Sequence, residues 1–240
     1  MPARFRYAPA IVERFPTIVG GVLYAGKVRN GPTPGGLREA LAAEVVRARE
    51  RFGDTPLSEV PSLAAWRRAF RAFGVDPTQY RSAAEALLRR LTKGGELPSI
   101  NAIADLANLV SIRWALPVAA FDQRPGTGPT TVRFARGDER WSDLGGSATD
   151  HPDPGEVIFV DERNEVSARR WCWRQSASSA VRDDTMQVLL TVEGHHEKAA
   201  DDVAAALADL EALIREYAAA DAVERAVLGP SRTAFETAAG

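Results

Sequence analysis

The stretch 97–117, LPSINAIADLANLVSIRWALP, is the segment that decides the fold. Its apolar residues, among them Ile103, Val110 and Trp114, recur at a spacing of three or four and share one side, which is typical of an amphipathic helix. Ser99 is a suitable N-cap, and Pro117 cannot continue a helix. We therefore predict a helix here, within a block of helices.

The opposite side of this predicted helix carries an unusual polar stripe. Asn101, Asp105 and Asn108 fall at positions i, i+4 and i+7, so they share a face. Asn and Asp inside a helix each cost roughly 0.5 kcal/mol relative to Ala, and residues that oppose the local preference often mark a site. The stripe therefore indicates a binding or catalytic site. The alternative is that it only forms hydrogen bonds to a neighbouring loop.

The segments around this helix predict an α+β fold. Helical spacing is found at residues 37–51, 61–74, 82–94 and 203–217, and strand-like composition at residues 15–25, 130–136, 156–161, 166–175 and 186–193. Because helices precede strands without βαβ alternation, we expect a helical block packed on a mainly antiparallel sheet or sandwich, with a long C-terminal helix. Gly20 and Gly21, inside the first strand, indicate a bulge or the close approach of another segment.

Composition limits the class of protein. The chain has 240 residues, 45% of them hydrophobic, which is enough for a sizeable core. Its single cysteine, Cys172, excludes a disulfide within the chain and a cysteine-based zinc site, and we expect neither a metal nor another cofactor. Because the sequence contains no long apolar run, we expect a cytoplasmic protein without a membrane span.

The charge is distributed unevenly. The net charge of −2 gives no general attraction for a polyanion. Basic residues nevertheless crowd one part of the helical block: Arg67, Arg68, Arg71, Arg81, Arg89, Arg90 and Lys93. Two explanations stay open, namely solvated helix faces and a patch that faces nucleic acid.

Two predicted strands carry further candidate ligand-binding residues. Arg174 and Gln175 follow Trp173 at the end of one strand. Arginine forks bind phosphate or carboxylate at two points and tryptophan stacks on flat groups, although a cross-strand ladder would use the same residues. Thr191 and Glu193 lie on the last strand, and Glu193 is a candidate general base.

Several short motifs, taken in order, are similar to a known family. They are FGVDP at 73–77, LPSIN at 97–101, DLAN at 105–108, PVAAFD at 117–122, VRFA at 132–135 and the segment from Thr185 to Glu193. Together they resemble the B3/B4 domain of the bacterial phenylalanyl-tRNA synthetase β subunit, particularly the free-standing proteins built around that domain. The resemblance covers residues 60–194.

The resemblance implies a B3/B4-like α+β fold and a role in translation quality control. In the synthetase this domain is the editing module, which hydrolyses tyrosine wrongly esterified to the phenylalanine tRNA. We therefore expect a tRNA acceptor end, an aminoacyl-tRNA or a free amino acid as partner, and an aminoacyl-tRNA deacylase that acts in trans. Residues 1–59 are expected to be an N-terminal extension, and residues 195–240 a C-terminal helix that completes the domain.

The resemblance also assigns roles to individual residues. Asp105 and Asn108 match the family motif, whereas Ala107 and Ala119 replace polar residues of it. The editing glutamate falls on Thr191, two residues before Glu193. We predict as catalytic Asn108, Asp105 and Glu193, and as substrate-binding Ser99, Asn101, Trp173, Arg174, Gln175 and Thr191. The two alanines favour the alternative of a non-catalytic module that binds tRNA or an amino acid.

Overall fold

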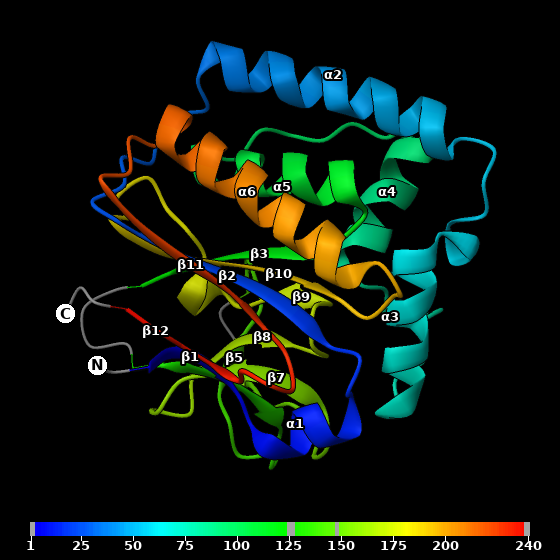
Figure 1. The fold of residues 1–240 in the computed structure, drawn as a ribbon, viewed down its shortest axis with the longest axis vertical. Coiled ribbons are helices and arrows are strands. Elements are labelled where there is room, and N and C mark those ends of the chain that lie inside the picture. The colour runs from blue at the N-terminus through cyan, green and yellow to red at the C-terminus, as the bar shows by residue number, and fades with distance from the viewer. Residues whose placement is uncertain (1–2, 124–127, 147–148, 238–240) are drawn as a thin grey trace.

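Helices on one side and two stacked β-sheets on the other build the molecule, as the computed structural model shows for residues 3–123, 128–146 and 149–237 (Figure 1). In this view α2 (Gly35–Phe52), α4 (Ala83–Thr92), α5 (Ala102–Trp114) and α6 (Ala199–Tyr217) lie above a four-stranded sheet, with α3 (Pro61–Ala72) to one side. A six-stranded sheet lies below, with α1 (Pro9–Arg14) beside it. The predicted α+β class is confirmed.

The helices begin and end close to the predicted positions. Ser82 caps α4 as expected, because its hydroxyl oxygen accepts a hydrogen bond from the Glu85 backbone N–H. The predicted N-cap of α5 is wrong. Asn101 takes this position because its side-chain oxygen accepts from the Ala104 N–H, while the Ser99 hydroxyl donates to Asp105.

The four-stranded sheet is antiparallel throughout. Its order is β11 (Ala222–Leu228), β2 (Val19–Gly26), β10 (Gln187–Gly194) and β3 (Val118–Asp122). β10 lies between two neighbours and is buried along almost its whole length. The pairing register sets Glu193 opposite Gly20 and Thr191 opposite both Val22 and Ala119.

The six-stranded sheet contains one parallel pair. Its order is β12 (Ala234–Glu236), β1 (Ala3–Tyr7), β4 (Thr130–Phe134), β7 (Val157–Val160), β8 (Val166–Arg169) and β9 (Arg174–Gln175). Only β1 and β4 pair in parallel among the described strands of this sheet. Two short strands, β5 (Trp141–Ser142) and β6 (Thr149–Asp150), form a separate ribbon, and η1 (Leu57–Glu59) and η2 (Ala177–Ser179) are single 3-10 turns.

Two expectations about the strands are corrected. The strand predicted over residues 166–175 is interrupted, because Arg170 and Trp171 have φ angles of 44° and 59° and turn the chain out of the sheet. The C-terminal segment is not helical to its end, since β11 and β12 follow α6 and pair with β2 and β1. The three-part division of the chain remains a prediction, with β2 and β11 both supplied from outside residues 60–194.

Buried residues form two main cores. One lies between the helices and the four-stranded sheet and includes Leu23, Ile103 and Leu207. The other lies between the two sheets and includes Phe121 and Trp171. Among the described residues, none of the helices is both long enough and apolar enough to cross a membrane.

A chain of ion pairs fastens three helices of the upper layer. Glu44 of α2 accepts from Arg113 of α5 at 3.0 Å and from Arg47 at 2.7 Å. Arg113 also donates to Asp209 of α6 at 2.8 Å. Burial acts to raise the pKa of Glu44, but the hydrogen bonds from the two arginines hold that pKa below its ordinary value.

We expect Glu44→Gln to lower the free energy of unfolding by about 1–2 kcal/mol at neutral pH, because it removes the anion that both arginines share. Because the folded-state pKa is lowered, the difference from wild type is present above the ordinary pKa and fades as the pH falls through the folded value. Urea denaturation measures the loss. Glu50→Gln, on the exposed surface of the same helix, is the matched control, and an equal effect of both changes would contradict the role of Glu44.

Candidate functional site

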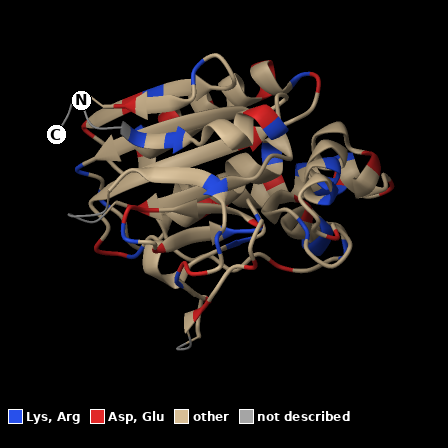
Figure 2. Ribbon diagram, turned by 90° about the horizontal axis from the view of Figure 1, so that it is seen from below, with Lys and Arg blue, Asp and Glu red and all other residues tan. Residues whose placement is uncertain are grey.

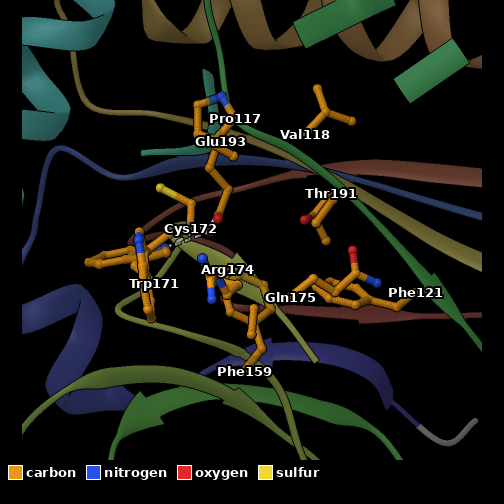
Figure 3. Close-up of a pocket in the computed structure, with 14 residues that line it drawn as sticks. Pro117, Val118, Phe121, Phe159, Trp171, Cys172, Arg174, Gln175, Thr191 and Glu193 are labelled. Carbon is orange, nitrogen blue, oxygen red and sulfur yellow. Dashed lines mark hydrogen bonds between the residues drawn. The ribbon is translucent and has the colours of Figure 1, made fainter. Parts of the chain in front are cut away.

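A small pocket of about 80 Å³ lies between the two sheets (Figure 3). The four-stranded sheet contributes β3 and β10 to its wall, and the six-stranded sheet contributes β7, β8 and β9. The turn 170–173 and the first residue of α4, Ala83, complete the wall. Val118, Phe121 and Phe159 give much of this wall an apolar character.

Glu193 is the acidic group of the pocket and is only 2% exposed. The Tyr7 hydroxyl donates to Glu193 Oε1 at 2.5 Å, and the Trp171 indole N–H lies 3.2 Å from both carboxyl oxygens. The Trp66 indole donates to the Glu193 backbone carbonyl at 3.2 Å. Three aromatic residues from β1, α3 and the turn 170–173 therefore hold one residue of β10.

The Tyr7 hydroxyl reaches Glu193 because Gly20 lies opposite on β2. A Cβ atom at position 20 would overlap the Tyr7 hydroxyl oxygen and lie 3.0 Å from the ring carbon that bears it. The ladder between β2 and β10 is regular at this point. Of the two possibilities raised by Gly20 and Gly21, the close approach is confirmed and the bulge is not found.

The turn after β8 aims Trp171 at Glu193. Left-handed backbone in a residue other than glycine costs roughly 1–2 kcal/mol, so neighbouring contacts must hold Arg170 and Trp171 in place. The Trp171 backbone N–H donates to the Val157 carbonyl at 2.6 Å. The Trp171 indole ring packs edge-on against Trp66 and Phe15, with ring centroids 5.2 and 5.0 Å away. Packing with three elements thus fixes the indole donor.

Burial changes the acid–base properties of the site. It raises the pKa of Glu193 to about 7, although the hydrogen bonds from Tyr7 and Trp171 act to lower it. Burial, and then the neighbouring Glu193 charge, raises the pKa of Tyr7 well above its ordinary value, so Tyr7 keeps its proton. A carboxyl group with a pKa near neutrality can both accept and release a proton at physiological pH.

Gln175 and Thr191 add polar groups to the pocket. The Gln175 amide nitrogen donates to the Ala120 carbonyl at 2.6 Å and to the Ser179 carbonyl at 3.0 Å, which leaves its oxygen as an acceptor. The structure records no partner for the Thr191 hydroxyl among the residues it describes. Figure 3 shows the side-chain oxygens of Glu193, Thr191 and Gln175 around the same space.

Five of the predicted site residues meet in this pocket. They are Trp173, Arg174, Gln175, Thr191 and Glu193. Arg174 is exposed and donates to Asp143 at 2.6 Å, and its guanidinium group lies over the Trp173 ring at 4.7 Å. The other two arginines of this segment, Arg169 and Arg170, form ion pairs with Glu156 at 2.7 and 3.0 Å.

The polar stripe lies elsewhere. Asp105 is fully buried and accepts hydrogen bonds from Thr33 at 2.7 Å, from Ser99 at 2.5 Å and from the Ile100 N–H at 3.1 Å. Asn101 caps α5 and donates to the Val181 carbonyl. Asn108 is half-buried on α5. None of these four predicted residues, Ser99, Asn101, Asp105 and Asn108, lines the pocket with Glu193.

Tyr7, Trp66 and Gly20 complete the site, although the sequence did not mark them as site residues. Phe5 and Tyr7 alternate with Arg4 and Arg6, a pattern typical of a half-buried strand, and this signal was present in the sequence. Nothing local pairs Tyr7 with Glu193, which lies 186 residues away.

The chain is similar to a known sequence family and to a solved structure. Residues 65–219 match the sequence model of the B3/4 domain family. Among solved structures, it is similar to an N-terminal fragment of the phenylalanyl-tRNA synthetase β-subunit from Pyrococcus horikoshii, with 15% identity and a TM-score of 0.39. The similarity covers 48% of this chain and 39% of that fragment. No curated protein matches the sequence.

The raised pKa of Glu193 predicts a pH-dependent stability difference between wild type and Glu193→Gln. Between pH 4.5 and about 7 the unfolded chain ionises Glu193 while the folded protein keeps it protonated, so wild type should lose about 3 kcal/mol of stability relative to the variant as the pH rises. Urea denaturation across this range measures the difference. Parallel stability curves for the two proteins would show that Glu193 titrates normally.

The comparison with Glu193→Gln is needed because His195 acts in the opposite direction. Burial, followed by the charges of His196 and Arg68, lowers the pKa of His195 from 6.5 to about 3. Unfolded His195 therefore binds a proton that the folded protein excludes, and stability rises with pH between these two values. Both proteins share this contribution, so it cancels in the difference.

Gly20→Ala should destabilise the protein by about 2–4 kcal/mol, because the new methyl group displaces the Tyr7 ring from Glu193. The loss should be smaller in a Tyr7→Phe background, where the hydroxyl is absent. Gly26→Ala is the matched control on the same strand, since its Cβ would meet nothing closer than 3.6 Å. If Gly20→Ala cost no more than Gly26→Ala, the close approach would not be a constraint.

Proposed function

The chain belongs to the B3/4 domain family, and from this premise we propose that it binds the aminoacylated 3′ end of a tRNA between its two sheets and hydrolyses the ester in trans. The observation that carries the proposal is the meeting of three side-chain oxygens, from Glu193, Gln175 and Thr191, under apolar walls. The tRNA as partner follows from the resemblance to the synthetase domain.

The pocket suits the amino-acid part of such a substrate. Its volume of about 80 Å³ admits a small group and leaves the nucleotide outside. The apolar walls fit the carbon skeleton, and the three oxygens are positioned to accept hydrogen bonds from an ammonium or hydroxyl group. Arg174, exposed beside the pocket, is the group that would exchange Asp143 for the terminal phosphate.

Glu193 is the proposed general base. It takes a proton from water as the water oxygen bonds to the ester carbonyl carbon. The bond to the ribose oxygen then breaks, and the same proton passes to that oxygen. A pKa of about 7 allows Glu193 to accept and return the proton. The Thr191 hydroxyl donates to the oxyanion that develops in between.

Binding without hydrolysis is the second candidate, and two observations favour it. Tyr7 and Trp171 already donate to the Glu193 carboxyl oxygens, so a water molecule must share these oxygens with the two donors. Thr191 is paired with Ala119, a residue without a polar side chain. In this case the pocket retains the aminoacyl group and leaves the ester intact.

A deacylation assay over a panel of mischarged tRNAs tests the proposal. Wild type should accelerate ester loss for at least one pair, and Glu193→Gln should reduce that rate at least about 100-fold through loss of the base. Asn108→Ala tests the polar stripe in parallel, and we expect wild-type rates because Asn108 lies outside the pocket. No acceleration over spontaneous hydrolysis for any pair would exclude hydrolysis.

Binding is then measured with an aminoacyl-tRNA analogue whose amino acid is joined by an amide bond, which is not hydrolysed. Binding that is weakened by Thr191→Val but not by Asn108→Ala would establish the non-catalytic alternative. Absence of binding to wild type would overturn both candidates.

A further inference from the structure

A second, strongly basic hollow lies on the helical block. It is a groove of about 410 Å³ between the loop 55–58 and the helices α3 and α4. One acidic side chain among its described lining residues, that of Glu85, faces four cationic ones. The four cations are Arg67, Arg81, Arg89 and Lys93. Figure 2 shows blue segments gathered on the helices at the right, the side on which α3 and α4 lie in Figure 1.

The periodicity of α4 builds one wall of this groove. Glu85, Arg89, Thr92 and Lys93 are separated by four, three and one residues, so they project from one face of the helix. Arg81 precedes the helix and Arg67 reaches in from α3. The crowding of basic residues noted in the sequence therefore includes four that converge on one groove.

Glu85 neutralises only one of the four positive charges. It is 4% exposed and accepts from Arg67 at 2.7 Å, and Arg81 Nε lies 3.8 Å from the same oxygen. Arg81 Nε is buried and has no hydrogen-bond partner within the described part of the chain. Arg89 and Lys93 are exposed, and no ion pair is found for them among the residues that the structure describes. The groove thus carries an excess of positive charge in a chain whose net charge is −2.

Arg89 and Lys93, which have no ion-pair partner among the described residues, and the hydroxyl groups of residues 55–58 together match the chemistry of phosphate groups. The groove also has a defined relation to the pocket. Ala83 at the start of α4 lines the pocket, and its N–H donates to the Cys172 carbonyl at 2.7 Å. Lys93 follows Ala83 by ten residues, which is about 15 Å along a helix.

We propose that this groove binds the sugar–phosphate backbone of the nucleic acid whose 3′ end enters the pocket. The inference rests on the proposed function for the identity of the partner. Successive phosphates lie along α4, with Arg81 nearest the pocket and Lys93 farthest from it. Base sequence is not read here, because cations and hydroxyl groups contact only the backbone.

The test measures binding of 5′-labelled unfractionated tRNA by fluorescence anisotropy over a range of salt concentrations. Arg89→Glu with Lys93→Glu should weaken binding at least tenfold at 0.1 M salt and reduce the slope of log K against log[salt] by about 2, one for each lost phosphate contact. Both residues are exposed, so the variant should keep the wild-type circular dichroism spectrum.

Arg68→Glu with Arg90→Glu is the matched control. It makes the same charge change on α3 and α4 at exposed residues that do not line the groove. Equal weakening by the two double variants would overturn the groove and leave only a general charge effect. The trinucleotide CCA, which is too short to span both sites, should bind wild type and the groove variant equally.

The outcomes separate this inference from the proposed function. If wild type deacylates a charged tRNA and the groove variant binds tRNA like wild type, the groove is overturned and the pocket stands. If the groove variant needs a higher concentration of charged tRNA than wild type but reaches the same deacylation rate at saturation, both the groove and the pocket stand. If wild type binds no tRNA, both are overturned.

Discussion

The burial of one carboxyl group, that of Glu193, is the constraint on which the rest of the site depends. A carboxyl group removed from water is tolerated only when donors replace the water, and here Tyr7 and Trp171 provide them. Each donor in turn requires an unusual feature of the backbone. Tyr7 needs a glycine opposite Glu193, and Trp171 needs a left-handed turn without glycine. The two sheets are thus joined through a polar contact, and the pocket lies beside it.

The same constraint limits what the pocket can do. Desolvation brings the pKa of Glu193 to about 7, which suits proton transfer, but the two donors occupy its oxygens and lower its capacity to hold a water. If the raised pKa prevails, the pocket hydrolyses the ester. If the occupation of the carboxyl oxygens prevails, the pocket only retains the aminoacyl group. Gln175 and Thr191 serve either, because they position a ligand without titrating near neutral pH.

The sequence predicted most helices and the central strand, because these elements are long and have clear periodicity. It missed β1, β11 and β12, which gain stability from partners far away in the chain. The polar stripe was correctly identified as unusual for the interior of a helix. Part of the reason is structural, because Asp105 accepts hydrogen bonds from Thr33 and Ile100 and Asn101 donates one to the Val181 carbonyl. Glu193 was recognised from its strand, whereas its partners depend on tertiary contacts that no local pattern encodes.

One helix connects the two candidate sites through its first turn. Ser82 caps α4 by accepting from the Glu85 N–H, and the Glu85 carboxyl group draws Arg67 and Arg81 to the same turn. Burial raises the pKa of Glu85, and the charges and hydrogen bond of the neighbouring arginines oppose this rise without cancelling it. These ion pairs therefore bring Arg67 and Arg81 to the N-terminal turn of α4, where both line the groove. An anion that enters the groove would compete with Glu85 for Arg67 and Arg81.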